Sequence, residues 1–403
     1  MVKKFGGTSV GSIERINAVA DRLVEDIRSG QKPIVVASAM AGETNRLVAL
    51  GNAIDPTYRG KAYDMLVASG EQVAIALLAM ALEKRGVAAQ PLLAYQLGIQ
   101  TDSIFSKARI TSIDGAALMK WVEQDIVPVV AGFQGVDEAD QITTLGRGGS
   151  DTTAVALAAA IQADVCEIYT DVAAVFTADP RIVPKAREVK ELSFEEMMEM
   201  ASLGSKVLHI RSVEIAAKYG VKIHLRSSFE RREGTYIISE GENVMEKPVV
   251  SAVTHDASTV VFKLFPVPFG PGFLTDLFGR LSERGVVVDI ITQSQNEEGQ
   301  RLAFSVTSED QPLVEKTLQD FVPPESEVRV MEDMAKISVV GVGMRNHPGV
   351  AARFFSVMKE LEVPVHLVTT SEIKISAVID RSDLEKTAQA LHSTFDLDRE
   401  LEA

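Results

Sequence analysis

The chain has 403 residues, of which 46% are hydrophobic and 24% are charged, a composition typical of a globular protein long enough for two or three domains. Its formal net charge of -15 argues against broad binding to nucleic acid or to an anionic membrane surface, so an anionic substrate needs a local cluster of positive charge. The single cysteine, Cys166, allows no intramolecular disulfide, and the first residues lack the apolar stretch of a signal peptide; both features lead us to expect a cytoplasmic protein.

The first 240 residues alternate between short apolar runs and helical patterns. VKKF (2–5) and PIVVAS (33–38) predict strands, and an apolar stripe between them predicts a helix over 12–30. Further predicted strands are 90–94, 108–113, 126–133, 165–170 and 221–226; further predicted helices are 61–84 with a break near 69–70, 114–124, 151–162, 193–202 and 209–219. The run VAIALLAMAL (73–82) is too short to cross a bilayer and predicts a buried helix. This alternation indicates a mainly parallel α/β sheet covered by helices on both faces.

The amino-acid composition of the chain changes after Arg226. The stretch SSFERREGTYIISEGENVMEKP (227–248) is charged and contains glycine, which predicts a linker or a domain edge. An internal repeat follows, in which Pro271 matches Pro348 at an offset of 77 residues. Each copy has the pattern strand, Pro-Gly, helix, strand, strand, helix. Because each copy is small for an independent core, we expect the two copies to pack together.

Two glycine-containing stretches are candidates for anion binding. In KKFGGTS, Gly6 and Gly7 allow backbone N–H groups to turn toward a ligand, and Lys4 supplies a point charge. In TLGRGGSDTT, glycines flank Arg147, and Ser150 with Asp151 is predicted to cap the apolar helix that follows. Taken singly, each stretch is also compatible with an ordinary turn or an ordinary capped helix.

Two further stretches carry polar residues where a ligand can be bound. In YTDVAAVFTADPRIV, Thr170 and Asp171 end a strand, and Arg181 follows in a turn. In LGSKVLH, Lys206 precedes a helix. The plain alternatives are two turns with a surface arginine, and a surface lysine. The sequence contains no GK[ST] of a Walker A loop and no His or Cys spacing typical of zinc, so no metal ligand is predicted.

Taken together, these stretches resemble the aspartate kinases of the amino acid kinase family. The motifs occur in the family's order: KFGGTSV, SAM..ETNRL, SGE, TLGRGGSDTT, YTDV...FTADPR, GSKVLHIRSVEIA, GVGMRNHPGVA and TSEIKIS. The C-terminal repeats resemble ACT domains, which are small regulatory modules that bind amino acids. The resemblance implies a catalytic domain over 1–240, a first ACT domain over 263–333, and a second ACT domain built from 248–262 plus 334–403, into which the first is inserted.

The resemblance also implies a reaction. ATP would transfer its γ-phosphoryl group to the side-chain carboxylate of L-aspartate, giving 4-phospho-L-aspartate, in the first step of lysine, threonine and methionine biosynthesis. ATP and Mg²⁺ are the implied cofactors. The implied catalytic residues are Lys4, Lys206, Arg147 and Asp151, and the implied aspartate-binding residues are Thr44, Glu71, Arg147, Ser150 and Asp151. The implied ATP-binding residues are Lys4, Phe5, Gly6, Gly7, Thr8, Ser9, Ser38, Thr170, Asp171, Phe176, Arg181 and Lys206.

The sequence departs from the family pattern mainly in the repeats. Phe269 stands where the family commonly has an acidic residue, and Val287 stands where an asparagine is expected. The candidate effector residues are Asp289, Gln293, Ser294, Val350, Ala351, Val365 and His366. Two interpretations stay open: feedback inhibition by lysine or threonine, or ACT domains that serve only to form a homodimer or a higher homo-oligomer.

Other functions are compatible with parts of this pattern. Another amino acid kinase, such as an acetylglutamate or glutamate 5-kinase, shares the glycine loops but lacks SGE, TSEIKIS and paired ACT units. A catalytically silent amino-acid sensor would keep the fold for binding alone. Met245 resembles the start of a separate short subunit made by internal initiation, and an ordinary linker methionine is the alternative.

Overall fold

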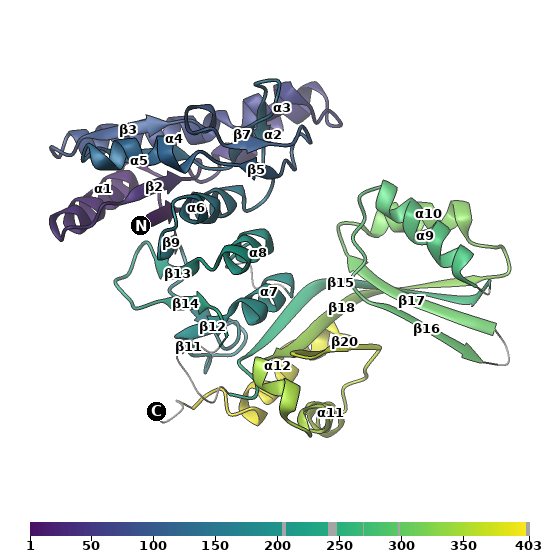
Figure 1. Ribbon diagram of the computed structural model, residues 1–403. Coiled ribbons are helices and arrows are strands. Elements are labelled where there is room, and N and C mark those ends of the chain that lie inside the picture. The colour runs from purple at the N-terminus through teal and green to yellow at the C-terminus, as the bar shows by residue number, and fades with distance from the viewer. Residues whose placement is uncertain (204–206, 241–247, 269, 297–298, 400–403) are drawn as a thin grey trace. The chain divides into compact units, whose positions relative to one another are not determined.

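The computed structural model describes residues 1–203, 207–240, 248–268, 270–296 and 299–399, and these form two compact units (Figure 1). The N-terminal unit contains Met1–Val175, Glu188–Ser202 and residues 207–240. The C-terminal unit contains Phe176–Arg187, Leu203 and the described residues from 248 onwards. Lys206, Met245 and Phe269, which carry three of the predictions above, lie outside the described residues.

An eight-stranded sheet forms the centre of the N-terminal unit, in the order β12-β14-β13-β9-β1-β2-β6-β3. Its strands are β1 Val2–Phe5, β2 Ile34–Ala37, β3 Ala89–Leu92, β6 Val127–Ala131, β9 Val165–Thr170, β12 Glu191–Ser193, β13 Lys222–Ser227 and β14 Thr235–Ile238. Neighbouring strands pair in parallel except β13 and β14. The predicted mainly parallel sheet is therefore confirmed, and the carboxyl ends of its central strands lie along one edge, where such sheets bind ligands.

Helices cover both faces of this sheet. α1 Ile13–Arg28 and α4 Ser69–Glu83 share an apolar core with one face, whereas α6 Gly149–Ala160 packs on β1 and β9 and contacts α8 Ile210–Tyr219. The other elements of this unit are α2 Glu43–Ile54, α3 Lys61–Val67, α5 Gly115–Glu123, α7 Phe194–Ser202, η1 Ala94–Leu97 and a small sheet of β5 Ile110–Ser112, β4 Gln100–Thr101, β7 Gln134–Val136 and β8 Ile142–Thr144. The short pair β10 Val175–Phe176 and β11 Glu188–Val189 also belongs to this unit, except for Phe176, which belongs to the C-terminal unit.

One described helical stretch, Lys61–Glu83, is long and apolar enough to cross a membrane by length and composition. Within the protein, 56% of its apolar window is buried. Ala68 separates α3 from α4 inside this stretch, near the break that the sequence predicts. Because α4 packs on the central sheet and on α1, the stretch has the features of a core helix of a globular protein.

Three features of this unit differ from the sequence predictions. Helix α2 is absent from those predictions, because it buries only Leu47 and follows Gly42, which has a left-handed conformation and no side chain for a cap. Strand β14 lies inside the predicted linker 227–248, where charged neighbours obscure its short apolar run. Helix α6 begins at Gly149 after Gly148, so Ser150 and Asp151 lie within its first turn and are not its caps.

The C-terminal unit is built on one six-stranded antiparallel sheet, in the order β16-β17-β15-β18-β20-β19. Its elements are β15 Ala252–Val267, α9 Pro271–Glu283, β16 Ile291–Asn296, β17 Gly299–Thr307, α10 Gln311–Phe321, β18 Glu327–Val340, η2 Val342–Asn346, α11 Val350–Glu360, β19 Leu367–Ser371, β20 Lys374–Asp380, η3 Arg381–Asp383 and α12 Leu384–Thr394. Each repeat has the predicted order of strands and helices. The long strands β15 and β18 run across the predicted limits at 262/263 and 333/334, so each strand serves both repeats; the domain limits themselves stay a prediction.

The segment Phe176–Arg187 is part of the C-terminal unit, although its sequence lies within the predicted catalytic domain. Ala178 and Val183 are buried in the core beneath α11 and α12. Thr177 accepts a main-chain hydrogen bond from Val253 at 2.8 Å, and its hydroxyl lies 2.8 Å from Nε2 of the buried His392. The chain therefore leaves the N-terminal unit after Val175, contributes to the second core and returns at Glu188.

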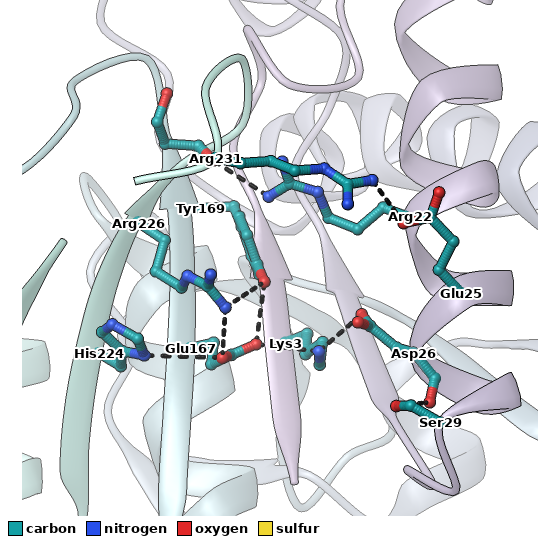
Figure 2. A network of polar contacts seen from close by, with 11 residues as sticks. Lys3, Arg22, Glu25, Asp26, Ser29, Glu167, Tyr169, His224, Arg226 and Arg231 are labelled. Carbon is teal, nitrogen blue, oxygen red and sulfur yellow. Dashed lines mark hydrogen bonds and ion pairs between the residues drawn. The ribbon is translucent and has the colours of Figure 1, made fainter. Parts of the chain in front are cut away.

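A network of charged side chains crosses the sheet on the face that α1 covers (Figure 2). Lys3, on β1, is 1% exposed, and its Nζ lies 2.7 Å from Asp26 of α1 and 3.0 Å from Glu167 of β9. Glu167 also contacts Arg226 of β13 at 3.1 Å and accepts a hydrogen bond from the hydroxyl of Tyr169 at 3.0 Å. Burial raises the pKa of Glu167, but hydrogen bonding and the positive charges around it outweigh burial and hold that pKa far below its ordinary value. The network therefore fixes three neighbouring strands to each other and to α1.

We predict that Lys3→Met lowers the free energy of unfolding by about 3 kcal/mol, because removing one partner leaves buried carboxylate charge without compensation. Lys32→Met is the matched control. Lys32 also has an ion pair at 2.7 Å, with Asp125, but its side chain is 58% exposed. The control is expected to change the free energy by less than about 1 kcal/mol. Urea unfolding of both variants measures the difference, and equal effects would contradict the proposed importance of the network.

Candidate active site

The glycine loop connects β1 to α1 at the carboxyl edge of the central sheet. The Gly6 N–H donates to the Tyr169 carbonyl at 3.1 Å, which ties the loop to β9. A Cβ atom on Gly7 would lie 2.9 Å from the carbonyl oxygen of Ala39, so this position requires glycine for close approach to the segment after β2. The Ser9 hydroxyl is hydrogen-bonded to the hydroxyl of Ser228, which follows β13. The loop is thus held from three strands.

Lys4 connects the two glycine-containing stretches of the sequence analysis, KKFGGTS and TLGRGGSDTT. Its Nζ lies 2.6 Å from the Asp151 carboxylate, which belongs to the first turn of α6. Both residues are largely buried, at 8% and 9% exposure. The first turn of a helix favours negative charge, from a side chain or from a bound anion. A buried ammonium beside a helix N-terminus is therefore able to hold a phosphate as well as a carboxylate.

The loop between β8 and α6 presents Arg147 on the surface of the N-terminal unit. Gly146 and Gly148 have left-handed conformations, with φ of 78° and 67°, on either side of this arginine. Ser150, two residues after Gly148, is 8% exposed and packs against Gly132, which follows β6. A Cβ atom built on Gly132 would lie 2.7 Å from the Cβ atom of Ser150. The end of β6 and the start of α6 therefore meet directly.

Glu71 is a buried carboxylate in the first turn of α4, with 3% exposure. Its Oε1 accepts a hydrogen bond from the Ala39 N–H at 3.0 Å, and its Oε2 has no hydrogen-bond partner among the described residues. Burial raises the pKa of Glu71 to about 7. A carboxylate with a free buried oxygen at this position is suited to accept a cationic group.

Hydrogen bonds connect these positions into one region. The Ser38 N–H donates to the carbonyl of Phe5 and the Ala41 N–H to that of Gly7, each at 3.1 Å, and the Gly132 N–H donates to Ala37 at 3.1 Å. The structure therefore brings together the ends of several central strands and the first turns of two helices. The predicted residues on these strand ends, loops and helix turns are Lys4, Phe5, Gly6, Gly7, Thr8, Ser9, Ser38, Glu71, Arg147, Ser150, Asp151, Thr170 and Asp171. Thr44 lies in the first turn of α2, shortly after the segment that follows β2.

Other predicted site residues are not brought into this region by the described contacts. Phe176 and Arg181 belong to the C-terminal unit, and the Arg181 side chain is 88% exposed and paired with Asp179 at 2.7 Å. The roles of both stay predictions. Ser228 is a residue that the sequence analysis missed; the available signal was a hydroxyl directly after a strand that runs parallel to β9.

Comparisons with known proteins agree with this architecture. A sequence model of the amino acid kinase family matches residues 1–227, and an ACT-domain model matches residues 337–395. An aspartate kinase of Pseudomonas fluorescens is 46% identical over 403 residues, covering 99% of this chain and 98% of that protein; one of Pseudomonas putida is 46% identical over 401 residues, with 99% and 98% covered. The structure of E. coli aspartokinase III in complex with aspartate and ADP has a TM-score of 0.79 at 27% identity, covering 98% of this chain and 99% of that chain.

The helix-covered parallel sheet, its glycine loop and the family match define a member of the amino acid kinase family. Within that family the chain belongs to the aspartate kinases, as the sequence resemblance predicted. It is therefore an ATP-dependent phosphotransferase that acts on a carboxyl group, and aspartate kinase is supported over the other amino acid kinases considered above.

The raised pKa of Glu71 gives a prediction about stability. Its value rises from 4.5 to about 7 on folding, so the folded chain binds this proton more tightly than the unfolded chain. The free energy of unfolding is therefore expected to fall by about 3 kcal/mol between pH 4.5 and pH 8 through this group. Urea unfolding of the wild type and of Glu71→Gln across this range measures the effect. The same pH dependence in both proteins would contradict it.

Proposed function

We propose that the region around Lys4 and Asp151 binds ATP and L-aspartate side by side and performs the transfer of the γ-phosphoryl group to the aspartate side chain. The observation that carries this proposal is the 2.6 Å contact between Lys4 and Asp151, because it joins the glycine loop on β1 to the loop that presents Arg147. The proposed residues for the two substrates are those given by the sequence analysis.

The phosphoryl transfer depends more on positive charge and on alignment of the reacting groups than on a general base. The side-chain carboxylate of aspartate is already ionised at pH 7, so no proton has to be removed before attack. One carboxylate oxygen forms a bond to the γ-phosphorus, the bond from that phosphorus to the β,γ-bridging oxygen breaks, and ADP leaves with the electron pair. Because an anion attacks a polyanion, Lys4 and the N–H groups of the glycine loop and of α6 would supply the stabilising charge.

In this proposal Lys4 changes its partner when ATP binds. Its ammonium, held by Asp151 at 2.6 Å, would contact the terminal phosphates of ATP. Asp151 and Ser150 would then line the space between the phosphate and the aspartate substrate. Lys206 and Arg181 would add positive charge, while Ser38, Thr170, Asp171 and Phe176 would border the nucleotide.

The aspartate substrate would be held at both of its charged ends. The guanidinium of Arg147 matches a carboxylate through two parallel hydrogen bonds, which suits the α-carboxylate of the substrate. Glu71 has a buried oxygen without a partner among the described residues, which suits the substrate ammonium. A bound ammonium would favour the ionised form of Glu71 and lower its pKa from about 7. Thr44, in the first turn of α2, would complete this pocket.

Magnesium is proposed to arrive as part of the substrate, MgATP. The described residues contain no group of three or more His, Cys, Asp or Glu side chains placed to hold a metal ion. The carboxylate of Asp151 is paired with Lys4. We therefore expect phosphate oxygens and water molecules to supply most of the ligands of Mg²⁺.

For the C-terminal unit we propose two roles, binding of a lysine or threonine effector and homo-oligomer formation. The carboxylate of Asp289, one of the candidate effector residues, is paired with the 3% exposed Lys336. His366 is paired with Asp380 at 3.0 Å, and the Val350 side chain is 7% exposed within the second core. The other candidate effector residues, Gln293, Ser294, Ala351 and Val365, are uncharged. E. coli aspartokinase III has been crystallised in complex with lysine and aspartate, and in this chain an effector ammonium that binds at Asp289 would replace the ammonium of Lys336.

We predict that Lys4→Ala lowers kcat for ADP release with aspartate by about 10²–10³, because one donor to the transferring phosphoryl group is lost. Lys32→Ala, which removes an exposed lysine, is the control and is expected to keep wild-type kcat. Thermal melting of both proteins verifies that they are folded. A folded Lys4→Ala protein with nearly wild-type kcat would refute the assigned role.

A further inference from the structure

The start of α8 carries two residues of the motif KVLHIRSVEIA to which the proposed function assigns no role: His209, the N-cap, and Arg211, in the first turn. Both contact the loop that presents Arg147. We propose that His209 and Arg211 are positioning residues that hold this loop, and through it the Arg147 guanidinium, in the orientation that binds aspartate. The inference rests on the proposed contact of Arg147 with the substrate.

Arg211 fixes the loop on the side that precedes Arg147. Its Nη1 donates to the carbonyl of Leu145 at 2.9 Å, and its Nη2 donates to the carbonyl of Ala108 at 2.8 Å. The Ala108 N–H itself donates to Thr144 at 2.9 Å, so these two stretches of chain are already neighbours. The planar guanidinium is therefore a rigid bridge across the two carbonyls, one of which lies two residues before Arg147.

His209 fixes the loop on the side that follows Arg147. A Cβ atom built on Gly148 would lie 2.2 Å from the His209 Cβ and 2.3 Å from its Cγ, so the bare backbone of Gly148 rests directly on this side chain. His209 is also the N-cap of α8, because its Nδ1 accepts a hydrogen bond from the Arg211 N–H at 3.4 Å. One helix turn thus supports both ends of the short arginine-bearing segment.

The sequence of the loop explains why such support is needed. Arg147 is followed directly by two glycines and preceded by a third, and glycine gives the backbone more conformational freedom than any other residue. The Arg147 side chain is exposed, and bidentate binding of a carboxylate depends strongly on the orientation of the guanidinium. A misplacement of about 1 Å can cost about 100-fold in a well-oriented site. The contacts from α8 therefore restrict the backbone conformations that the glycines would otherwise allow.

The central test is Arg211→Lys, which keeps the positive charge but cannot bridge two carbonyls with a planar group. We expect kcat/KM for aspartate to fall by about 10- to 100-fold, through a higher aspartate KM, with the ATP KM changed by less than about twofold. His209→Asn keeps a side chain that caps helices but removes the ring below Gly148, and we expect the same selective effect. Equal changes in the two KM values, or no change in folded variants, would overturn the proposal.

Arg85→Lys is the matched control. Arg85 also donates to two main-chain carbonyls, those of Ala81 at 2.8 Å and Asn17 at 3.2 Å, but neither belongs to the predicted site. We expect it to leave the aspartate KM unchanged. A purely structural role of Arg211 would give the same kinetic result as this control.

A double-mutant cycle separates this inference from the proposed function. Arg147→Ala alone tests the proposed function, and its failure to lower kcat/KM for aspartate selectively would overturn both proposals. If Arg211 acts through Arg147, adding Arg211→Lys to Arg147→Ala is expected to lower kcat/KM by less than about twofold more. A full, independent effect of Arg211→Lys in the Arg147→Ala background would overturn the positioning role and leave the role of Arg147 intact.

Discussion

The ion pair between Lys4 and Asp151 is the interaction on which the proposed site depends. It connects the first strand of the sheet to the helix that begins after the Arg147 loop, and both partners are about nine-tenths buried. Burying two charges costs desolvation that their attraction only partly offsets, so such a pair is a poor source of stability. Its location suggests a different use, in which the ammonium is kept dry and oriented until a phosphate replaces the carboxylate.

The two neighbouring lysines of β1 lie on opposite faces of the sheet and have different roles. Because successive side chains point to opposite faces, Lys3 faces α1 and Lys4 faces α6. Lys3 has two carboxylate partners in a network that joins three strands (Figure 2), whereas a single ion pair is described for Lys4. The network on one face holds β1 in register, and the other face of the same strand presents its charge to the site.

The sequence allowed much of this arrangement to be predicted, because its signals are local. Gly6 and Gly7 directly follow an apolar strand, and parallel strands bring their carboxyl ends to one edge, so the position of the glycine loop at the edge of the sheet follows from the sequence pattern. Features that depend on contacts between distant parts of the chain could not be predicted in this way. Helix α6 begins after Gly148 without a side-chain cap, Ser228 becomes relevant only where it meets Ser9, and the segment Phe176–Arg187 joins a core that its own sequence does not reveal.

A crystal structure of the protein with a non-hydrolysable ATP analogue, Mg²⁺ and aspartate tests the proposed site most directly. We expect Lys4 Nζ to lie about 3 Å from an oxygen of the terminal phosphates. We also expect the Arg147 guanidinium to contact the α-carboxylate of aspartate, and Glu71 to contact its ammonium. A complex in which Lys4 stays paired with Asp151, while the phosphates lie on other residues, would contradict the proposed site.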